Sequence, residues 1–382
     1  MAVIVGWRSL LAAGSALALA VTLAACASPS VPTPAPETQP PVAQAPAPEP
    51  DESYEALTEP LTQFEEPLAS QPPAAVKVGL LLPLSGARAD VGQALLNAAE
   101  LALFDLGGDR FTLVIRDTQG TPEGAAAAAR QVLAEDAALI LGPLFSTSAE
   151  AVKPVVDEAG VPMITFSNNN AIAGPQSFVM GITPRTQVDR VVDYAVGRSD
   201  EAAQRALARL QGVETIGELP FDAILLPASG QQLLSVAPLL AYYDVDPSEV
   251  RFLGTALWED PQLLSEPTLQ GGWFPAPPPT LWKAFRDRYQ QSFGDTPPRV
   301  ASLAYDAVAL AAVLDQRGER EGAFVAYTQD AITQTLGFAG IDGIFRFLPS
   351  GQVQRGLAVL ELRRAGFIER DPAPGSFPAG IN

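Results

Sequence analysis

The sequence predicts an α/β fold with two doubly wound lobes, and three features of the chain carry this prediction. Residues 76–85 form a dense apolar run that ends in a Pro, Ser and Gly turn, as a buried parallel strand does. An alanine-rich segment with helical periodicity follows to residue 107, and the alternation of strand and helix then continues to about residue 182. The pattern changes after residue 196, which indicates a second lobe.

The elements of the first lobe follow from apolar runs separated by turn residues. We expect strands at residues 111–116, 138–141, 161–165 and 177–180, and helices at 122–136 and 146–158. The last helix opens with the polar cluster Ser146, Thr147 and Ser148 and stops at Gly160. Four or five parallel strands with right-handed crossovers complete a Rossmann-like lobe of about residues 76–182 plus 299–336.

The second lobe is expected over about residues 183–298 plus 337–366, followed by a tail from 367 to 382. Apolar runs predict strands at 221–226, 250–254 and 271–274, and helical spacing predicts helices at 185–196, 231–243 and 281–293. Helices are also expected at 301–316 and 322–336, in the range 299–336 assigned to the first lobe. Two further strands, 343–347 and 357–363, flank a Pro349, Ser350 and Gly351 turn. We expect them to pair as a hairpin that closes the domain.

Composition excludes several classes of chemistry. The chain has 382 residues, with 24 Lys and Arg against 43 Asp and Glu, so its net charge of −19 argues against nucleic acid as a partner. It contains no histidine and one cysteine, Cys26. Histidine-based triads, zinc sites built from His or Cys, and intramolecular disulfides are therefore excluded.

The N-terminus predicts a lipoprotein signal peptide over residues 1–25. It carries one charge, Arg8, before an apolar core from Leu10 to Leu23. Leu-Ala-Ala-Cys at residues 23–26 resembles a bacterial lipobox, which is cut before the cysteine and acylated on it. In the lipoproteins that it resembles, a residue such as Ala27 favours the outer membrane. The alternative is an uncut signal anchor in which the cysteine is incidental.

Residues 26–75 are expected to form the lipidated cysteine and a proline-rich tether. Thirteen of the 36 prolines lie here, so the segment tends to polyproline II and cannot bury a core. Five apolar residues recur within it at helical spacing, although Pro60 and Pro67 argue against a continuous helix: Tyr54, Leu57, Leu61, Phe64 and Leu68. They are either scattered apolar residues of a linker or a short partner-binding element.

Several motifs together resemble the type 1 periplasmic binding fold. They are Val-Gly-Leu-Leu-Leu-Pro-Leu-Ser-Gly at 78–86, Leu-Gly-Pro-Leu-Phe-Ser at 141–146, Val-Pro-Met-Ile-Thr-Phe-Ser-Asn at 161–168 and Ala-Ser-Leu-Ala-Tyr-Asp-Ala-Val at 301–308. The lipobox, the tether, residues 141–145 and Gly-Gly-Trp-Phe at 271–274 look most like the penicillin-binding protein activator family. The leucine-, isoleucine- and valine-binding receptors of amino-acid importers share the opening strand and the Ser-Thr-Ser loop.

This resemblance implies a non-enzymatic outer-membrane lipoprotein without a cofactor that binds and activates a peptidoglycan synthase, a class A penicillin-binding protein, from the periplasmic side. The alternative is a solute receptor for branched-chain or other amino acids that feeds an ABC importer. Trp258, Trp273 and Phe274 offer the large apolar area that anchors protein partners. A third class, an enzyme that acts on cell-wall sugars, lacks a recognisable acid and base pair.

The receptors also imply a candidate ligand groove, in which an amino-acid head is held at a helix N-terminus. Its matching positions are Ser85, Gly86, Ser146, Thr147, Ser148, Ser167, Asn168 and Asn169, with Ser229 and Trp258 from the second lobe. The structural alternatives are plain N-capping at 146–148 and an Asx-rich turn at 167–170. Asp244, Asp246 and Glu249 fit a solvated turn better than a calcium loop.

The chain departs from the activator pattern in two respects. No helical repeat domain precedes the binding-fold domain, and residues 199–210 predict a helix where the family places a strand, helix and strand. The resemblance therefore implies a second lobe shorter by about two strands and one helix, through natural loss or a gap in the gene model. The strand edge near residues 221–226 is then either covered by the 199–210 helix or exposed.

Overall fold

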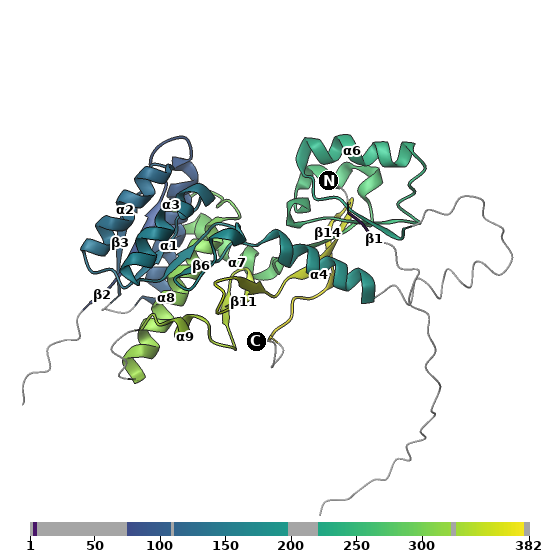
Figure 1. Ribbon diagram of the computed structural model, residues 1–382. Helices are drawn as coiled ribbons and strands as arrows, with labels where there is room; N and C mark the ends of the chain where they lie inside the picture. Colours follow the sequence, from purple (N-terminus) through teal and green to yellow (C-terminus); the bar gives the residue numbers. More distant parts are fainter. Residues whose placement is uncertain (1–2, 6–74, 108–110, 198–220, 322–325, 378–382) are drawn as a thin grey trace, which may run out of the picture. The chain divides into compact units, whose positions relative to one another are not determined.

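The computed structural model describes residues 3–5, 75–107, 111–197, 221–321 and 326–377. The chain separates into two compact units, Met1–Trp7 with Pro73–Asn382 and Arg8–Pro72, and all described residues belong to the first. Cys26, the proline-rich tether and the helix expected at 199–210 lie outside the described residues. The predicted two-lobed α/β architecture is confirmed (Figure 1).

The first lobe is built on a five-stranded parallel sheet. Its strand order is β3-β2-β4-β5-β6, with β2 (Val76–Leu82), β3 (Phe111–Asp117), β4 (Leu139–Leu141), β5 (Met163–Thr165) and β6 (Ser177–Val179). The central strands are apolar throughout because helices cover both faces of the sheet. Leu80 faces one helical layer and Leu81 the other, and both are fully buried.

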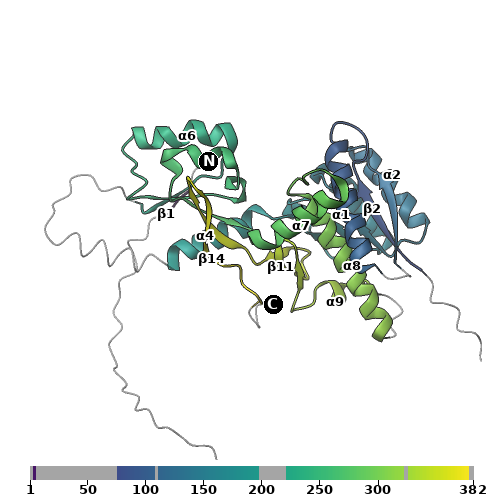
Figure 2. The same ribbon diagram turned by 180° about the vertical axis from the view of Figure 1, so that it is seen from behind.

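Each face of this sheet has its own helical layer. Helices α1 (Ala89–Leu106) and α8 (Ala301–Glu321) lie side by side on one face (Figures 1 and 2). On the other face α2 (Pro122–Ala134) packs against α3 (Ser146–Ala159) through small alanine side chains. Helix α2 begins where Thr121 accepts a hydrogen bond from the Gly124 amide at 3.1 Å, as an N-cap residue does.

The second lobe contains a mixed six-stranded sheet of order β1-β7-β8-β9-β13-β14. Its strands are β1 (Val3–Val5), β7 (Ala223–Leu225), β8 (Arg251–Leu253), β9 (Trp273–Ala276), β13 (Ala358–Arg363) and β14 (Gly366–Asp371). Only β7, β8 and β9 run parallel, and the others pair antiparallel. In the unprocessed chain the outer edge of β7 pairs with Val3–Val5, a strand that cleavage of the predicted signal peptide would remove.

Helices also cover this sheet on both faces. Helix α6 (Gly230–Tyr242) and the short helices η2 (Ala256–Trp258), η3 (Pro261–Ser265) and η4 (Pro267–Leu269) close the larger core. Helix α4 (Pro184–Gly197) packs on the opposite face against β7, β8 and β9. With three parallel strands against five, this lobe is the smaller α/β unit in the part of the chain that the structure describes.

The C-terminal region corrects three expectations. Strand β11 (Gly343–Phe347) pairs with β12 (Val353–Arg355) and β10 (Phe338–Gly340), and not with residues 357–363. The tight turn, with Gly351 at φ 81°, reverses the chain directly after β11, and the chain leaves this small sheet after Arg355 and enters the second-lobe sheet as β13 (Ala358–Arg363). Helix α7 (Pro279–Phe293), expected in the second lobe, packs into the core of the first, and only the short α9 (Gln329–Ile332) forms within 326–336.

The described residues contain neither a membrane-spanning helix nor a cluster of metal ligands. None of their helices is both long enough and apolar enough to cross a membrane. They also contain no group of three or more His, Cys, Asp or Glu side chains placed to hold a metal ion.

Candidate ligand-binding edge of the first lobe

The carboxyl ends of the parallel strands bring most of the predicted site residues to one edge of the first lobe. Ser85 and Gly86 follow β2, Ser146 follows β4, and Ser167 follows β5. Neighbouring parallel strands end at the same side of a sheet, so residues distant in sequence meet there. This edge is where ligands bind in open α/β sheets.

A pair of serine hydroxyls lies at the centre of the edge. Ser146 Oγ and Ser167 Oγ are 2.9 Å apart, and Ser167 Oγ also accepts a hydrogen bond from the Asn169 amide at 3.1 Å. Ser167 is held in place because its own amide donates to Thr165 Oγ1 at 3.2 Å. The structure thus joins the two groups of polar residues that the sequence predicted on separate loops.

Helix α3 presents an uncapped N-terminus beside this pair. The N-cap residue is Phe145, whose side chain cannot accept a hydrogen bond from the first-turn amides. Aligned peptide dipoles place partial positive charge at such an end, which favours a carboxylate or another anion. Ser148, in this first turn, is fully buried, and its Oγ has no hydrogen-bond partner within the described structure. Thr147 is exposed.

The asparagine loop combines structural and available polar groups. Asn169 Oδ1 accepts from the Ala171 amide at 3.0 Å and begins the short helix η1 (Asn170–Ile172), as the Asx-turn alternative requires. Its Nδ2 donates to Glu150 Oε1 at 3.1 Å. Asn168 is exposed at the same turn. Asn169 therefore shapes the loop, and Asn168 is the more accessible amide.

Asp117 organises the loop after β2 and was missed as a site residue. Its carboxylate accepts hydrogen bonds from the Ser85 hydroxyl at 2.6 Å and from the amides of Leu84, Ser85 and Gln119 at 2.9, 3.2 and 2.7 Å. Burial acts to raise the pKa of Asp117, but these hydrogen bonds outweigh it and hold the pKa below its usual value. The signal was available, because Asp117 is the residue at which the apolar 111–116 run ends.

The second-lobe members of the predicted groove behave differently. Trp258 is fully buried, and its Nε1 donates to the Leu226 carbonyl at 3.2 Å, so its assignment to the groove is wrong. The apolar indole ring packs in the core, and the buried carbonyl meets the hydrogen-bonding need of its single N–H group. Ser229 is the N-cap residue of α6, half-buried, and its side chain makes no cap hydrogen bond.

The apolar anchors expected for a protein partner are also mostly internal. Phe274 is fully buried against Trp258 and Phe367. Trp273 is half-buried, with Tyr194 edge-on at 5.0 Å and the Arg251 guanidinium 4.5 Å above its ring. The idea that these side chains form an exposed docking surface is therefore wrong.

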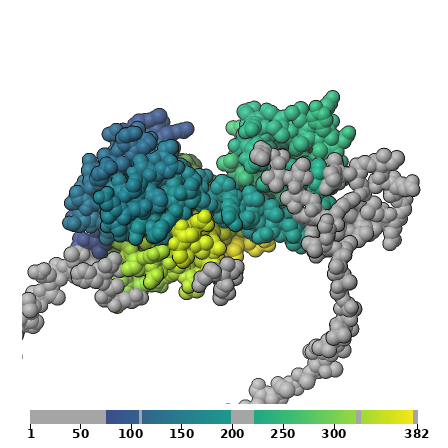
Figure 3. Space-filling view, in the orientation of Figure 1, coloured from purple at the N-terminus to yellow at the C-terminus, as the bar shows by residue number. Residues whose placement is uncertain are grey.

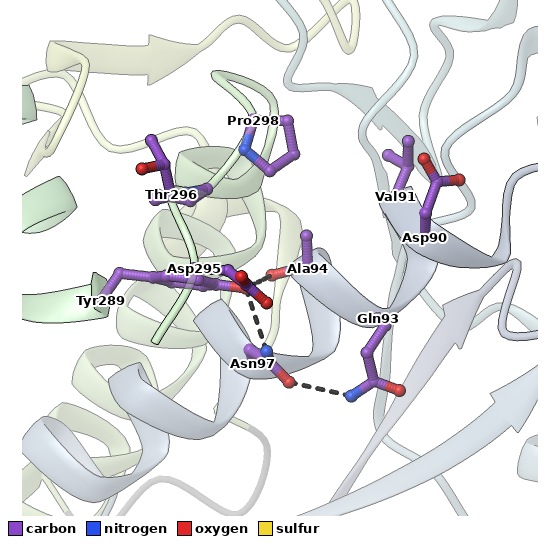
Figure 4. A pocket seen from close by; sticks show the side chains of 10 residues that line it. Asp90, Val91, Gln93, Ala94, Asn97, Tyr289, Asp295, Thr296 and Pro298 are labelled. Atoms are coloured by element: carbon purple, nitrogen blue, oxygen red, sulfur yellow. Dashed lines mark hydrogen bonds between the residues drawn. The ribbon is translucent and has the colours of Figure 1, made fainter. Parts of the chain in front are cut away.

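A separate hollow of about 370 Å³ lies between α1 and the end of α7 (Figure 4). Tyr289 receives a hydrogen bond on its hydroxyl from Asn97 Nδ2 at 3.0 Å, and Gln93 donates to Asn97 at 2.8 Å. The charged side chains that line it, Asp90 and Asp295, are both acidic, which disfavours an anionic ligand. It contains none of the predicted site residues.

The edge of the first lobe can bind a ligand, but it does not assemble a catalytic set. Its polar groups are hydroxyls, amides and the hydrogen-bonded Asp117, the chain has no histidine to serve as base, and its one cysteine, Cys26, lies outside the described residues. The arrangement can hold a small polar or anionic group by hydrogen bonds.

Comparisons with known proteins agree with this fold. Residues 75–206 match the family model described as "Periplasmic binding protein". The Leu/Ile/Val-binding protein BraC3 of Rhizobium johnstonii is 31% identical over 98 residues, 24% of this chain and 27% of that protein. An uncharacterised protein of Rickettsia prowazekii is 28% identical over 120 residues, 31% of this chain and 32% of that protein. The chain thus matches less than two thirds of the length of each curated relative.

Solved structures extend the similarity to both lobes. A putative branched-chain amino acid ABC transporter protein from Rhodospirillum rubrum superposes with a TM-score of 0.63 at 21% identity, covering 78% of this chain and 100% of that one. A branched-chain amino acid ABC transporter periplasmic ligand-binding protein from Burkholderia xenovorans gives a TM-score of 0.58 at 16% identity, covering 80% and 95%. The chain has the two-lobed α/β fold of periplasmic binding proteins.

Proposed function

We propose that the protein is a non-enzymatic receptor that binds a small carboxylate-bearing solute of the amino-acid class at the edge of its first lobe. The observation that carries this proposal is the pair of Ser146 and Ser167 hydroxyls, 2.9 Å apart, beside the uncapped N-terminus of α3. In this role the first-turn amides and Ser146 donate to one carboxylate, and the helix dipole stabilises its charge.

The electrostatics of the site favour a zwitterion over a simple anion. No Lys or Arg lies among the predicted site residues, so the carboxylate is held by dipoles and hydroxyls. Glu150 and Asp117 lie in hydrogen-bond contact with the two sides of the edge, through Asn169 and Ser85. They supply negative charge near the place where an ammonium group would sit. An amino acid satisfies both requirements.

The compounds bound by similar proteins support this choice of solute class. BraC3 is a Leu/Ile/Val-binding protein. Among the similar solved structures, one from Streptococcus pneumoniae is a complex with isoleucine and one from Rhodopseudomonas palustris is a complex with 3,4-dihydroxybenzoic acid. Both bound compounds carry a carboxyl group. We therefore propose that the protein binds the solute in the periplasm and delivers it to an ABC importer.

We also propose that the mature protein is tethered to the periplasmic face of the outer membrane through Cys26. Each buried methylene of an acyl chain contributes about 0.8 kcal/mol, so two or more chains hold a protein on a membrane without any apolar face on its domain. Cys26→Ser should move the protein to the soluble periplasmic fraction. Membrane association of a folded Cys26→Ser protein would exclude this anchor.

The binding proposal is tested by thermal unfolding of the full chain with a panel of amino acids. A ligand at 100 times its Kd stabilises the folded state by about 2.7 kcal/mol, which raises the melting temperature measurably. Ser146→Ala should abolish the rise, whereas Ser235→Ala, an exposed helical serine of the second lobe, should keep it. A rise that persists in Ser146→Ala would place the ligand elsewhere, and no rise with any amino acid would reject the proposal.

The penicillin-binding protein activator function is the second candidate, and it is supported by the resemblance of the lipobox, the tether and residues 271–274. Trp258 and Phe274, which were expected to bind the synthase, are buried and unavailable for such a contact. An assay of the same full-chain protein with a purified synthase distinguishes the receptor function from the activator function. An increased polymerising or crosslinking rate of a purified class A penicillin-binding protein, together with no thermal shift by amino acids, would favour the activator function.

A further inference from the structure

Helix α6 carries an exposed apolar face that no part of the proposed ligand site uses. We name its members, Val236, Leu239, Tyr242 and Tyr243, the α6 stripe; their exposed fractions are 36%, 54%, 77% and 72%. The opposite side of the helix buries Leu233 and Ala237 in the second-lobe core. Helix α6 lies at the outside of the second lobe in the ribbon view, and the green surface is open on that side in the space-filling view (Figures 1 and 3).

The stripe is continuous along the helix. Val236, Leu239 and Tyr242 recur at three-residue spacing, so they lie on one face of the helix, and Tyr243 is the C-cap residue that follows directly. The outward face of a helix on a soluble domain is ordinarily polar, and clustered exposed apolar side chains mark an interaction surface. The rings of Tyr242 and Tyr243 lie edge to face with centroids 5.2 Å apart, which leaves ring faces available to a partner.

The charged residues of the segment that carries the stripe, 230–250, are all acidic. Residues 230–250 contain no Lys or Arg, whereas Asp244, Asp246 and Glu249 directly follow the stripe and are all exposed. The backbone carries these acids in a defined turn, with Asp244 at φ 62° and the Ser248 amide donating to Asp246 Oδ1 at 2.7 Å. The stripe is thus an apolar and aromatic patch with an acidic rim.

We propose that the α6 stripe docks a protein segment with an apolar ridge flanked by Lys and Arg side chains. The apolar ridge packs on Val236 and Leu239, a guanidinium or ammonium group stacks on the Tyr242 or Tyr243 ring, and the acidic rim pairs with neighbouring cations. This inference does not depend on the proposed solute.

Other occupants fit the charge less well. A second copy of this chain brings the same acidic rim and a further net charge of −19, which opposes self-association. An anionic membrane surface repels Asp244, Asp246 and Glu249 for the same reason. A basic partner is the occupant whose charge complements that of the stripe.

The test uses the full chain and a defined probe, a labelled amphipathic helical peptide of about 20 residues with Leu on one face and Arg on its flanks. We expect saturable binding by fluorescence anisotropy that weakens as salt rises. The double variant Tyr242→Ser with Tyr243→Ser should weaken the binding at least tenfold. Phe104→Ser, which removes an 84% exposed aromatic side chain from α1 in the first lobe, should leave it unchanged.

A second variant pair tests the acidic rim separately. Asp244→Asn with Glu249→Gln should weaken peptide binding and reduce its salt dependence, because fewer ion pairs form. Circular dichroism of each variant establishes that it remains folded. Equal binding of a twin peptide with Glu in place of Arg, or unchanged affinity in the tyrosine double variant, would overturn the proposal. A concentration-dependent dimer in sedimentation that the double variant abolishes would also overturn it, since the occupant would then be a second copy.

Discussion

The two lobes share a doubly wound plan but differ in how completely they follow it. In the first lobe five parallel strands lie between two helical layers, and β2 and β3 pair over seven residues each. In the second lobe the parallel strands β7 and β8 are three residues long, and antiparallel strands complete the sheet on both sides. The parallel sheet of the first lobe ends in a loop edge rich in hydroxyls. In the second lobe Trp258, which was expected to face a ligand, is instead buried in the core of the lobe.

This difference indicates that the two lobes have different roles, with the polar loops of a ligand site on the first lobe and an exposed apolar helix face on the second. Ligand-binding residues cluster where several parallel strands end side by side, because each strand end contributes one loop. The first lobe has loops after β2, β3, β4 and β5 that exchange hydrogen bonds, such as those of Asp117 with Ser85 and of Ser146 with Ser167. The second lobe instead presents an exposed helix face.

The largest effect is expected for Trp258→Ala in the second lobe. The substitution removes a fully buried indole and its hydrogen bond to Leu226, and comparable truncations cost about 3–5 kcal/mol. Urea unfolding of the full chain measures the change. Leu257→Ala, the adjacent 58% exposed residue, is the control and should cost within about 0.5 kcal/mol. If Trp258→Ala lowers the free energy of unfolding only slightly but abolishes ligand binding, Trp258 belongs to the ligand groove and not to the core.

A pH effect is expected from a buried carboxyl group on α8. Burial, together with the nearby Asp342, raises the pKa of Asp306 to about 7 from its ordinary value near 3.8. The folded state therefore holds a proton that the unfolded chain releases near its ordinary pKa. The stability that this proton contributes is complete below that value and is lost as pH rises towards 7. Asp306→Asn should unfold with a melting temperature that falls less than that of the wild type over this range.

The geometry of this site explains why asparagine is a suitable replacement. Asp306 Oδ1 accepts from the Ile341 amide at 2.7 Å, and an asparagine oxygen can do the same. Asp330→Asn, an exposed change on α9, provides the control for altered net charge. Parallel melting curves for the wild type and Asp306→Asn from about pH 4 to pH 7.5 would show that the carboxyl does not titrate in this range.

A smaller contrast is expected between one N-cap residue in each lobe. Thr121 accepts a hydrogen bond from the Gly124 amide at the start of α2, so Thr121→Ala should cost about 1 kcal/mol. Ser229 begins α6 without a side-chain cap hydrogen bond, so Ser229→Ala should cost only a few tenths of a kcal/mol, about the size of an ordinary surface substitution. Chemical denaturation compares the two. Equal losses of unfolding free energy in Thr121→Ala and Ser229→Ala would show that the two helix N-termini are capped to the same extent.

The sequence predicts most of the first lobe because its signals are local. The apolar run of β2 and the alanine pattern of α2 match their observed bounds closely, and the Ser-Thr-Ser cluster does begin α3. The meeting of Ser146 with Ser167 was predictable from the rule that parallel strands end at one edge. The sequence places Asp117 directly after the 111–116 strand, but the four hydrogen bonds that its carboxylate accepts from two loops are a tertiary feature that no local pattern shows.

The errors have a common physical cause. Residues 343–347 and 357–363 are both good strand sequences, but pattern alone does not specify which strands pair; the tight turn at Gly351 and the break at Gly356 do. Helix α7 is amphipathic, and its apolar face does not reveal which lobe it packs against. Trp258 was assigned to the groove from the family resemblance, but in this chain its ring is fully buried in the second-lobe core.

The central claim, that the first-lobe edge binds a carboxylate, is tested most directly by calorimetric titration of the full chain with a matched pair of compounds. The pair is the amino acid that gives the largest thermal shift and its amide, which keeps the ammonium group and side chain but lacks the carboxylate. We predict that the amino acid binds at least tenfold more tightly than the amide in the wild type, and that Ser146→Ala with Ser167→Ala removes this preference. Equal affinity for the two compounds, or a preference unchanged in the double variant, would contradict the account.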